Sequence, residues 1–231
     1  MIGIIGAMEE EVEQIVAAME VTREETKASM TFKAGKLSGK DAVIVVSGIG
    51  KVNAGICTQI LVDDFNVDCV INTGIAGSLN TAIDIGDIVI SSDVLHHDMD
   101  ATGFGYPKGQ IPQMKEFSFP ADKSLRELAK KLCMEVNPDI HVFCGRIVSG
   151  DQFISDQGVK DRIVSEFHGY ATEMEGAAIG QAAYLNGVPF LVIRAISDKA
   201  DGSAHVDYPA FEAAAIKHSV RLTMAMIKAL D

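Results

Sequence analysis

The stretch MIGIIGAMEEEVEQIVAAM, residues 1–19, joins a short apolar run to a helical pattern. Residues 2–5 form a run that predicts a buried strand ending at Gly6. Behind it, Val12, Ile15, Val16 and Met19 recur at i, i+3, i+4 and i+7, which is the apolar stripe of a helix. A strand followed directly by a helix is typical of α/β proteins.

The same alternation continues along the chain. Further strands are predicted over residues 30–37, 41–47, 68–72, 87–95, 141–149 and 189–196, and helices over 52–65, 122–136, 156–167, 173–186 and a closing segment striped by Ile216, Val220, Met224 and Ile227. A Gly-rich turn is expected at 73–77 and a long functional loop at 96–120. We predict one α/β domain over residues 1–231, with a mixed, mostly parallel central sheet flanked by helices.

The composition excludes several classes of function. The 231 residues are 48% hydrophobic and 23% charged, as in globular proteins. A net charge of −12 without a basic cluster repels phosphate groups, so neither nucleic acid nor a membrane surface is expected as a partner. The apolar runs fall far short of the roughly 20 residues that span a bilayer.

The cysteines and the start of the chain bear on location. Cys57, Cys69, Cys133 and Cys144 are widely spaced among apolar residues, which predicts reduced packing thiols and no zinc site. Met1 leads into an apolar run without a basic start, so no secretory signal is expected. We therefore predict a cytoplasmic protein.

Three acidic residues follow predicted strands, at the sheet edge where α/β proteins bind ligands. Glu11 lies in the first turn of the first helix, Glu175 opens the helix over 173–186, and Asp198 follows the strand over 189–196. Spacing alone leaves two alternatives open. Glu11 and Glu175 would also suit simple helix-capping charges, and Asp198 an ion pair with Arg194.

Six blocks of the sequence resemble those of a known protein family. They are IGIIGAMEEE at 2–11, SGIGKV at 47–52, NTG at 72–74, VSGD at 148–151, EME at 173–175 and RAISD at 194–198. In this order and spacing, the chain resembles the 5′-methylthioadenosine/S-adenosylhomocysteine nucleosidases of the nucleoside phosphorylase superfamily over essentially its whole length.

The resemblance implies hydrolysis of the bond between adenine and ribose in 5′-methylthioadenosine and S-adenosylhomocysteine, and also in 5′-deoxyadenosine. An oxocarbenium-like transition state of this kind needs an acid for the leaving group and a base for water. By resemblance, Asp198 donates a proton to the purine N7 and Glu11 orients and deprotonates water. Glu175 then binds the ribose hydroxyls.

The resemblance also implies the rest of the site, without metal or cofactor. Met174 is expected against the ribose, Arg194 beside the acid and Glu175, and Ser197 in a hydrogen bond to Asp198. The remaining pocket residues are Phe153 stacked on adenine, the Ile154 backbone at its edge, Ile49 and Met8 on the apolar wall, and Tyr208 where relatives have Phe. Core packing stays open as an alternative for Met8 and Ile49.

Two further expectations follow from the resemblance. Ile75 stands where some relatives have Ser, so the backbone amides of Ala76 and Gly77 are expected to compensate. Phe104 and Pro112 of the long loop are expected to cover the alkylthio group of a partner subunit, which implies a homodimer.

Three other functions remain to be weighed. A purine nucleoside phosphorylase needs a phosphate site, but the Gly-rich segments hold no Arg and Glu11 would repel phosphate. A futalosine hydrolase differs only around the 5′ substituent, and the sequence leaves it open. A non-catalytic nucleoside binder needs neither Glu11 nor Asp198.

Overall fold

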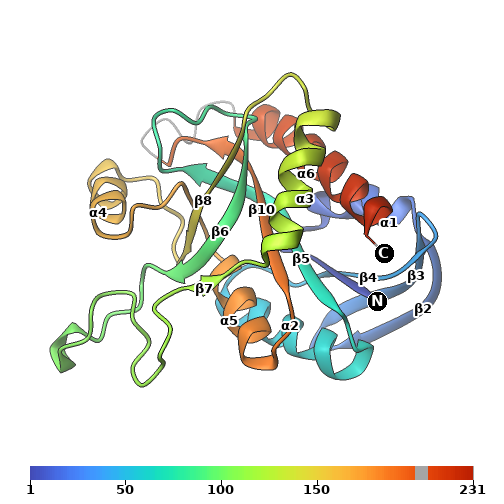
Figure 1. Ribbon diagram of the computed structural model, residues 1–231, viewed down its shortest axis with the longest axis horizontal. Coiled ribbons are helices and arrows are strands. Elements are labelled where there is room, and N and C mark those ends of the chain that lie inside the picture. The colour runs from blue at the N-terminus through green and yellow to red at the C-terminus, as the bar shows by residue number, and fades with distance from the viewer. Residues whose placement is uncertain (201–207, 231) are drawn as a thin grey trace.

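The computed structural model describes residues 1–200 and 208–230, with the side chains of 208–210 left out of the description. One ten-stranded sheet runs through it in the order β10-β6-β8-β9-β5-β1-β4-β3-β2, with β7 beside β6 (Figure 1). Its strands are β1 Ile2–Gly6, β2 Glu20–Lys27, β3 Met30–Leu37, β4 Lys40–Val46, β5 Cys69–Ser78, β6 Ile88–His96, β7 Phe119–Pro120, β8 Val142–Ser149, β9 Ala171–Glu173 and β10 Phe190–Asp198.

Part of this sheet closes on itself. Strand β10 pairs with β6 and also with β5, and the chain of pairings β6–β8–β9–β5 completes the ring. Strands β1, β4, β3 and β2 extend outward from β5. The predicted mixed sheet is confirmed, although five of its ten pairings are parallel and five antiparallel.

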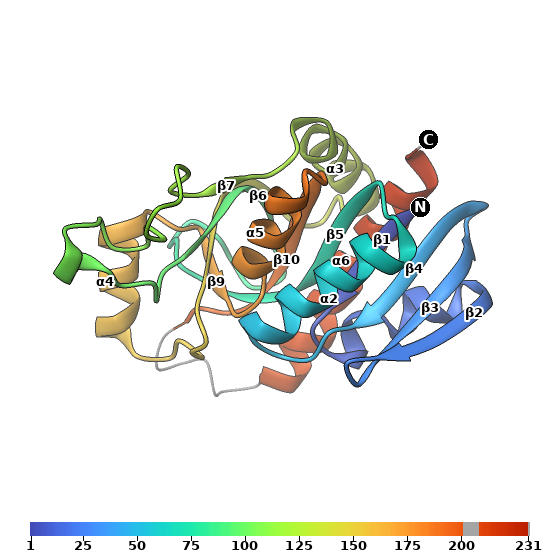
Figure 2. The same cartoon turned by 90° about the horizontal axis from the view of Figure 1, so that it is seen from below.

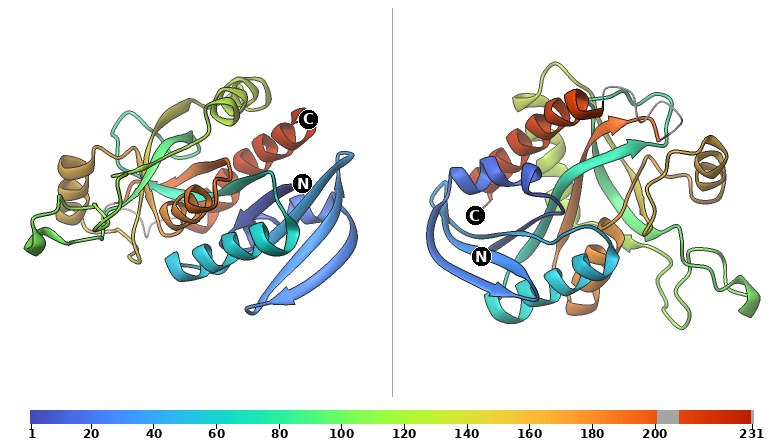
Figure 3. Two further views of the ribbon diagram at one scale, coloured as in Figure 1. Left: turned by 60° about the horizontal axis from the view of Figure 1, so that its bottom comes forward. Right: turned by 180° about the vertical axis from the view of Figure 1, so that it is seen from behind.

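Helices cover the sheet on both sides. Figures 2 and 3 show α2 and α5 packed together on one side and α6 on the other, where α3 packs against α6. The helices are α1 Glu13–Ala17, α2 Lys51–Phe65, α3 Lys123–Val136, α4 Gln157–Phe167, α5 Gly176–Asn186 and α6 Tyr208–Ala229, with short 3-10 turns η1 Glu9–Glu11 and η2 Thr102–Phe104. No helix in the described residues is long and apolar enough to cross a membrane.

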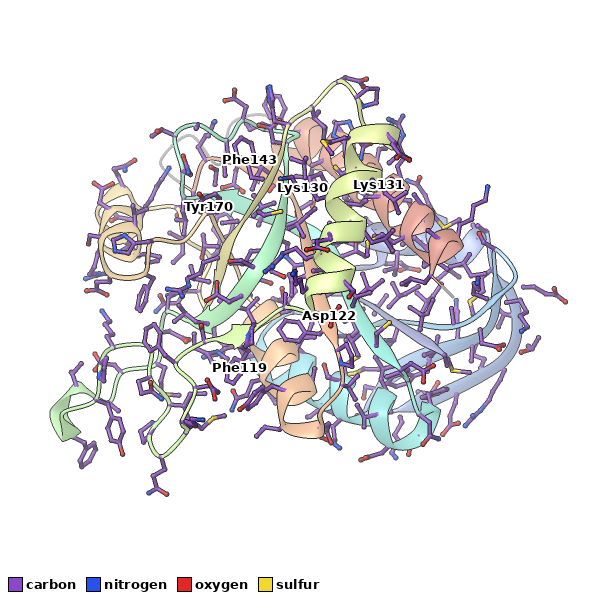
Figure 4. All side chains as sticks on the ribbon, viewed as in Figure 1. Phe119, Asp122, Lys130, Lys131, Phe143 and Tyr170 are labelled. Atoms are coloured by element: carbon purple, nitrogen blue, oxygen red, sulfur yellow. The ribbon has the colours of Figure 1, made fainter. Side chains whose placement is uncertain are left out.

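Local sequence explains where two of these helices begin. Asp122 precedes α3 (Figure 4), and its carboxylate accepts a hydrogen bond from Leu125 N at 2.9 Å. Asp156 accepts one from Val159 N at 2.9 Å at the start of α4. Each aspartate satisfies an N–H that the first helical turn would otherwise leave free.

Strand β5 is longer than the sequence predicted. Residues 73–77, which suggested a turn, continue as regular strand to Ser78 and pair with β10 along the way. A Cβ on Gly74 would lie 2.4 Å from Glu11 Oε1, and one on Gly77 would lie 2.9 Å from Asp198 Oδ1. These glycines are therefore strand positions that leave room for neighbouring carboxylates, and the turn prediction was wrong.

Other boundaries differ for similar local reasons. The predicted helix over 173–186 begins only at Gly176, because Glu173 ends the short strand β9. The first helix is broken into η1 and the five-residue α1, so Glu11 lies in a 3-10 turn. Strand β2 was not predicted, since its sequence EVTREETK lacks apolar alternation.

Part of the long loop after β6 projects from the body of the molecule (Figures 1 and 2). Its tip carries η2, and the segment returns to the sheet through β7, which pairs with β6. The ring of Phe104 on this tip is 87% exposed. The segment is therefore ordered at its base and presents an uncovered aromatic side chain at its tip.

Candidate active site

Glu11 is held by backbone amides from two directions. Strand β1 ends at Gly6, and the following η1 turn carries Glu11 back under the strand ends, where it is 3% exposed. Its Oε2 accepts hydrogen bonds from Ala7 N at 2.6 Å and Met8 N at 3.1 Å. Its Oε1 accepts one from Ile75 N at 3.1 Å. The carboxylate is thus fixed between η1 and β5.

The environment of Glu11 favours its protonated form. Burial raises the pKa of Glu11, and Arg194 and the three backbone N–H groups only partly oppose that effect. A carboxylate whose pKa is raised is a stronger base than an exposed one. The position is therefore suited to accepting a proton.

Glu175 lies at the start of α5 and is 5% exposed. Its Oε1 accepts a hydrogen bond from Gly50 N at 2.9 Å, in the turn that precedes α2. Its Oε2 lies 3.8 Å from a guanidinium nitrogen of Arg194. The pKa of Glu175 is raised to about 7, first by burial and then by the charge of Glu173, while Arg194 opposes the rise.

Arg194 lies behind the cavity and is 1% exposed. It pairs with Glu173 and, at longer range, with Glu175, and its Nη2 donates to Asn72 Oδ1 at 2.6 Å. Its pKa is raised, because these carboxylates and Glu11 outweigh the cost of burial. Arg194 thus lies 3.8 Å from Glu175, and the support that it gives to Glu175 and to the acid stays a prediction.

Asp198 closes the site at the end of β10 and is 5% exposed. Ser197 Oγ donates to its Oδ2 at 2.9 Å, which confirms the predicted hydrogen bond. Ala200 N donates to its Oδ1 at 2.7 Å. The strand end and these two donors fix the direction of the carboxyl group.

These groups share one cavity of about 150 Å³. It is lined by Ala7, Met8, Glu11, Ile49, Ile75, Ala76, Gly77, Phe153, Thr172, Glu173, Met174, Glu175, Ser197 and Asp198. A smaller cavity of about 30 Å³ shares several of these residues and adds Gln152 and Ile154. At the mouth, Ile49 is 56% exposed and Phe153 is 54% exposed. Ile49 is therefore a wall residue rather than core.

Some predicted site residues do not line this cavity, since Ile154 lines only the smaller one and Arg194 lines neither. Phe104 and Pro112 do not line it, and both belong to the projecting segment (Figure 3). Tyr208 begins α6, but its side chain lies outside the described residues. Among residues 1–200 and 208–230, no group of His, Cys, Asp and Glu side chains could hold a metal ion.

Sequence reasoning gave no role to Glu173, which lines both cavities and pairs with Arg194. Thr172 beside it was missed as well. The sequence assigned Glu173 to the start of a helix and Thr172 to the residue before it, rather than to the end of a strand. A correct assignment of β9 would have placed Glu173 at a strand end, and that position would have marked it as a candidate site residue.

Known proteins share this architecture throughout. Residues 1–228 match the family described as the phosphorylase superfamily. The 5′-methylthioadenosine/S-adenosylhomocysteine nucleosidase of Shewanella oneidensis is 45% identical over 231 residues, which cover 100% of this chain and 97% of the relative. The corresponding enzyme of Neisseria meningitidis, solved with methylthio-immucillin-A, has a TM-score of 0.94 at 39% identity, covering 99% of each chain.

A second similar structure has another activity in its name. The futalosine hydrolase of Helicobacter pylori has a TM-score of 0.93 at 34% identity and covers 99% of this chain and 97% of its own. Its fold is therefore shared, while the identity to the nucleosidase of Shewanella is higher. The chain belongs to the phosphorylase superfamily and, within it, to the family of the 5′-methylthioadenosine/S-adenosylhomocysteine nucleosidases.

Proposed function

We propose that this chain hydrolyses the N-glycosidic bond of 5′-methylthioadenosine and S-adenosylhomocysteine, and of 5′-deoxyadenosine, releasing adenine and the 5′-substituted ribose. The observation that carries the proposal is one cavity lined by four buried carboxyl groups, among them those of Glu11, Glu175 and Asp198, with an aromatic side chain at its mouth. The family membership of the chain supports the substrate class.

Three of the carboxyl groups each have a proposed role in the reaction. Asp198 gives a proton to N7 of adenine as the bond between C1′ and N9 breaks, so that the purine leaves as a neutral molecule. Glu11 takes a proton from the water that adds to C1′. The ionised Glu175 accepts hydrogen bonds from the ribose hydroxyls and lies near the positive charge that develops on the sugar.

The apolar part of the cavity holds the remainder of the substrate. Phe153 stacks on adenine and the Ile154 backbone meets its edge, while Met174 packs against the ribose. Met8 and Ile49 enclose the start of the 5′ substituent, and the amides of Ala76 and Gly77 face the reacting sugar. Ile75 adds an apolar side chain and gives its own N–H to Glu11.

Charge favours water over phosphate as the nucleophile. None of the described residues that line the cavity is Lys or Arg. The nearby Arg194 already pairs with Glu173 and Glu175. A phosphate dianion would therefore meet four carboxyl groups without a free cation, which is strongly unfavourable in a buried site.

Adenine release tests this proposal directly. The purified chain is incubated with 5′-methylthioadenosine, with and without phosphate, and the products are separated by chromatography. We expect adenine and free methylthioribose at the same rate in both samples. A sugar phosphate that forms only with phosphate present would contradict hydrolysis. No adenine from this nucleoside, but release of the base from futalosine, would assign the chain to the other hydrolase.

We also propose a cytoplasmic homodimer. The exposed ring of Phe104 does not line the cavity of its own chain, so a role in covering substrate would come from a second copy. Val52, Ile56 and Leu185 on the paired helices α2 and α5 are exposed apolar side chains that suit a subunit contact. The four cysteines are free, which fits a reducing compartment.

A further inference from the structure

Glu173 has no part in the reaction described above, yet it is a buried charged residue of the same cavity. It ends β9, opposite Ser149 in the neighbouring strand β8, and is 8% exposed. A buried carboxylate is costly unless other groups compensate its charge and satisfy its oxygens. The partners of Glu173 therefore indicate what it does.

One set of partners belongs to the first turn of α5. Glu173 Oε2 accepts hydrogen bonds from Gly176 N at 2.8 Å and Glu175 N at 3.2 Å. Ser149 Oγ donates to Glu173 Oε1 and accepts from Ala177 N at 2.7 Å. Together, Glu173 and Ser149 satisfy three successive N–H groups that a helix start leaves without partners.

The fit around this carboxylate is close. A Cβ at Gly176 would lie 3.2 Å from both carboxylate oxygens of Glu173. Glycine at this position lets the side chain fold directly onto the helix start. Because Glu175 lies between Glu173 and Gly176, the same contacts fix the backbone that carries Glu175.

The other partner is Arg194. Its Nη2 donates to Glu173 Oε2 but lies 3.8 Å from Glu175 Oε2, beyond hydrogen-bond distance. The guanidinium group is held on the inner side of the cavity by Glu173 and Asn72. Glu175 therefore meets the charge of Arg194 without being tied to it by a hydrogen bond.

We propose that Glu173 is a positioning residue: its carboxylate holds Arg194 back from Glu175 and fixes the first turn of α5, so that Glu175 stays available to the ribose hydroxyls. This inference rests on the proposed function, because it concerns the residue that binds the sugar there. Glu173 acts through Arg194 and Glu175 and need not touch the reacting atoms.

A capping role alone and a positioning role differ in their electrostatic consequence. The charges that act on Glu175 come from Glu173 on β9, Glu11 on η1 and Arg194 on β10, and Gly50 N donates to it from the turn before α2. The negative charge of Glu173 raises the pKa of Glu175. Removing the negative charge of Glu173 lowers the pKa of Glu175. Loosening the first turn of α5 alone keeps that charge, so the pKa of Glu175 stays raised.

The substitution Glu173→Gln removes the charge and keeps the shape. The amide oxygen can take the Oε2 position and accept from Arg194, Glu175 N and Gly176 N. The amide nitrogen then faces Ser149, whose hydroxyl can rotate to accept its hydrogen bond. Glu173→Gln therefore preserves the contacts of α5, while the loss of the negative charge weakens the hold on Arg194 and lets it approach Glu175.

The experiment is a pH profile of adenine release from 5′-methylthioadenosine by the wild-type chain and Glu173→Gln. We expect the acid limb of kcat/KM to move down by about one pH unit, which makes the deficit of Glu173→Gln roughly fivefold smaller at pH 6 than at pH 8. At pH 8, KM should rise about tenfold with kcat little changed, because Arg194 competes for Glu175. An unmoved acid limb would overturn the proposal.

Ser149→Ala is the matched variant, because it removes an anchor of Glu173 and keeps the charge. We expect a KM a few times higher and an unmoved acid limb. If circular dichroism shows that Glu173→Gln does not fold, Ser149→Ala decides: a raised KM at unchanged kcat supports the positioning role, and an unchanged KM overturns it. If the wild-type chain releases no adenine, the proposed function fails, and the same pH shift is sought in the Kd of the unhydrolysed nucleoside.

Discussion

The two halves of the candidate active site differ in how complete they are within one chain. The half that carries the charges is buried: Glu11, Glu173, Glu175 and Asp198 are each at most 8% exposed and have hydrogen-bond partners in place. The apolar half is open. Ile49 and Phe153 are more than half exposed at the mouth, and Phe104 is 87% exposed on the projecting segment.

This difference separates the chemistry from the recognition of substrate. Carboxyl groups fixed before substrate binds need little rearrangement in the transition state, which is the basis of electrostatic catalysis. Exposed apolar side chains instead gain free energy when a ligand or a partner covers them. Changes at Glu11 and Asp198 in the buried half should therefore affect kcat, and changes in the apolar half should affect KM.

The largest effect is expected for Glu11→Gln, which removes the proposed base but leaves an oxygen to accept the backbone N–H groups. Turnover of 5′-methylthioadenosine should fall by about a thousandfold or more, within the range assigned to general acid–base catalysis. Glu10→Gln is the control, because Glu10 is an exposed neighbour on the same turn. Initial rates of adenine release measure both. Normal turnover by Glu11→Gln would disprove the assignment of the base.

Asp198→Asn should lower kcat by about a hundredfold or more, because an amide cannot protonate the leaving adenine. Binding should persist, since Asn keeps the contacts with Ser197 and Ala200. The exposed Asp139→Asn is the control. Calorimetric binding of adenine and single-turnover rates separate the two effects. Full activity of Asp198→Asn would mean that another group protonates the purine.

The buried half was also the more predictable from sequence. Strand ends can be located from apolar runs, and Glu11 and Asp198 follow two of them closely. Glu173 was not predictable in the same way, because its role depends on Arg194 and Ser149, which are distant in sequence. A local periodicity of the sequence does not encode contacts between residues on three different strands.

The errors in the fold have a common physical origin. Gly74 and Gly77 suggested a turn because glycine is usual there, whereas their small size here admits carboxylates from other elements. Strand β2 escaped prediction because an exposed strand at the sheet edge is held by its backbone pairing with β3 and needs no apolar pattern. The ring closure through β10 depends on long-range pairing, which a linear pattern does not specify.

Burial of Glu175 should leave a pH-dependent cost in stability. Its pKa is raised from 4.5 to about 7 in the folded chain, so the folded state binds the extra proton between these values. The resulting stability is fully present below pH 4.5 and is lost as pH rises through about 7. Glu175→Gln should therefore have a free energy of unfolding about 3 kcal/mol higher than that of the wild type at pH 8, and the two should converge near pH 4.5.

Urea titrations of both chains at several pH values measure this difference, with the exposed Glu135→Gln as control. The same Glu175→Gln protein should bind nucleoside poorly, since the amide no longer offers a charge to the ribose. A wild-type stability that stays constant between pH 5 and 8, or rises, would contradict the burial cost assigned to Glu175.

The smallest effect is expected at the open half, from Phe104→Ala. If this ring covers the 5′ substituent in a partner subunit, its loss should raise KM for 5′-methylthioadenosine several-fold with kcat nearly unchanged, because only apolar contact is removed. Met134→Ala on α3 is the control, since Met134 is also a large exposed apolar side chain. Sedimentation velocity should show a dimer for both variants. An active wild-type monomer, or a Phe104→Ala protein with unchanged KM, would show that each chain completes its own apolar wall, and the contrast between the two halves would then disappear.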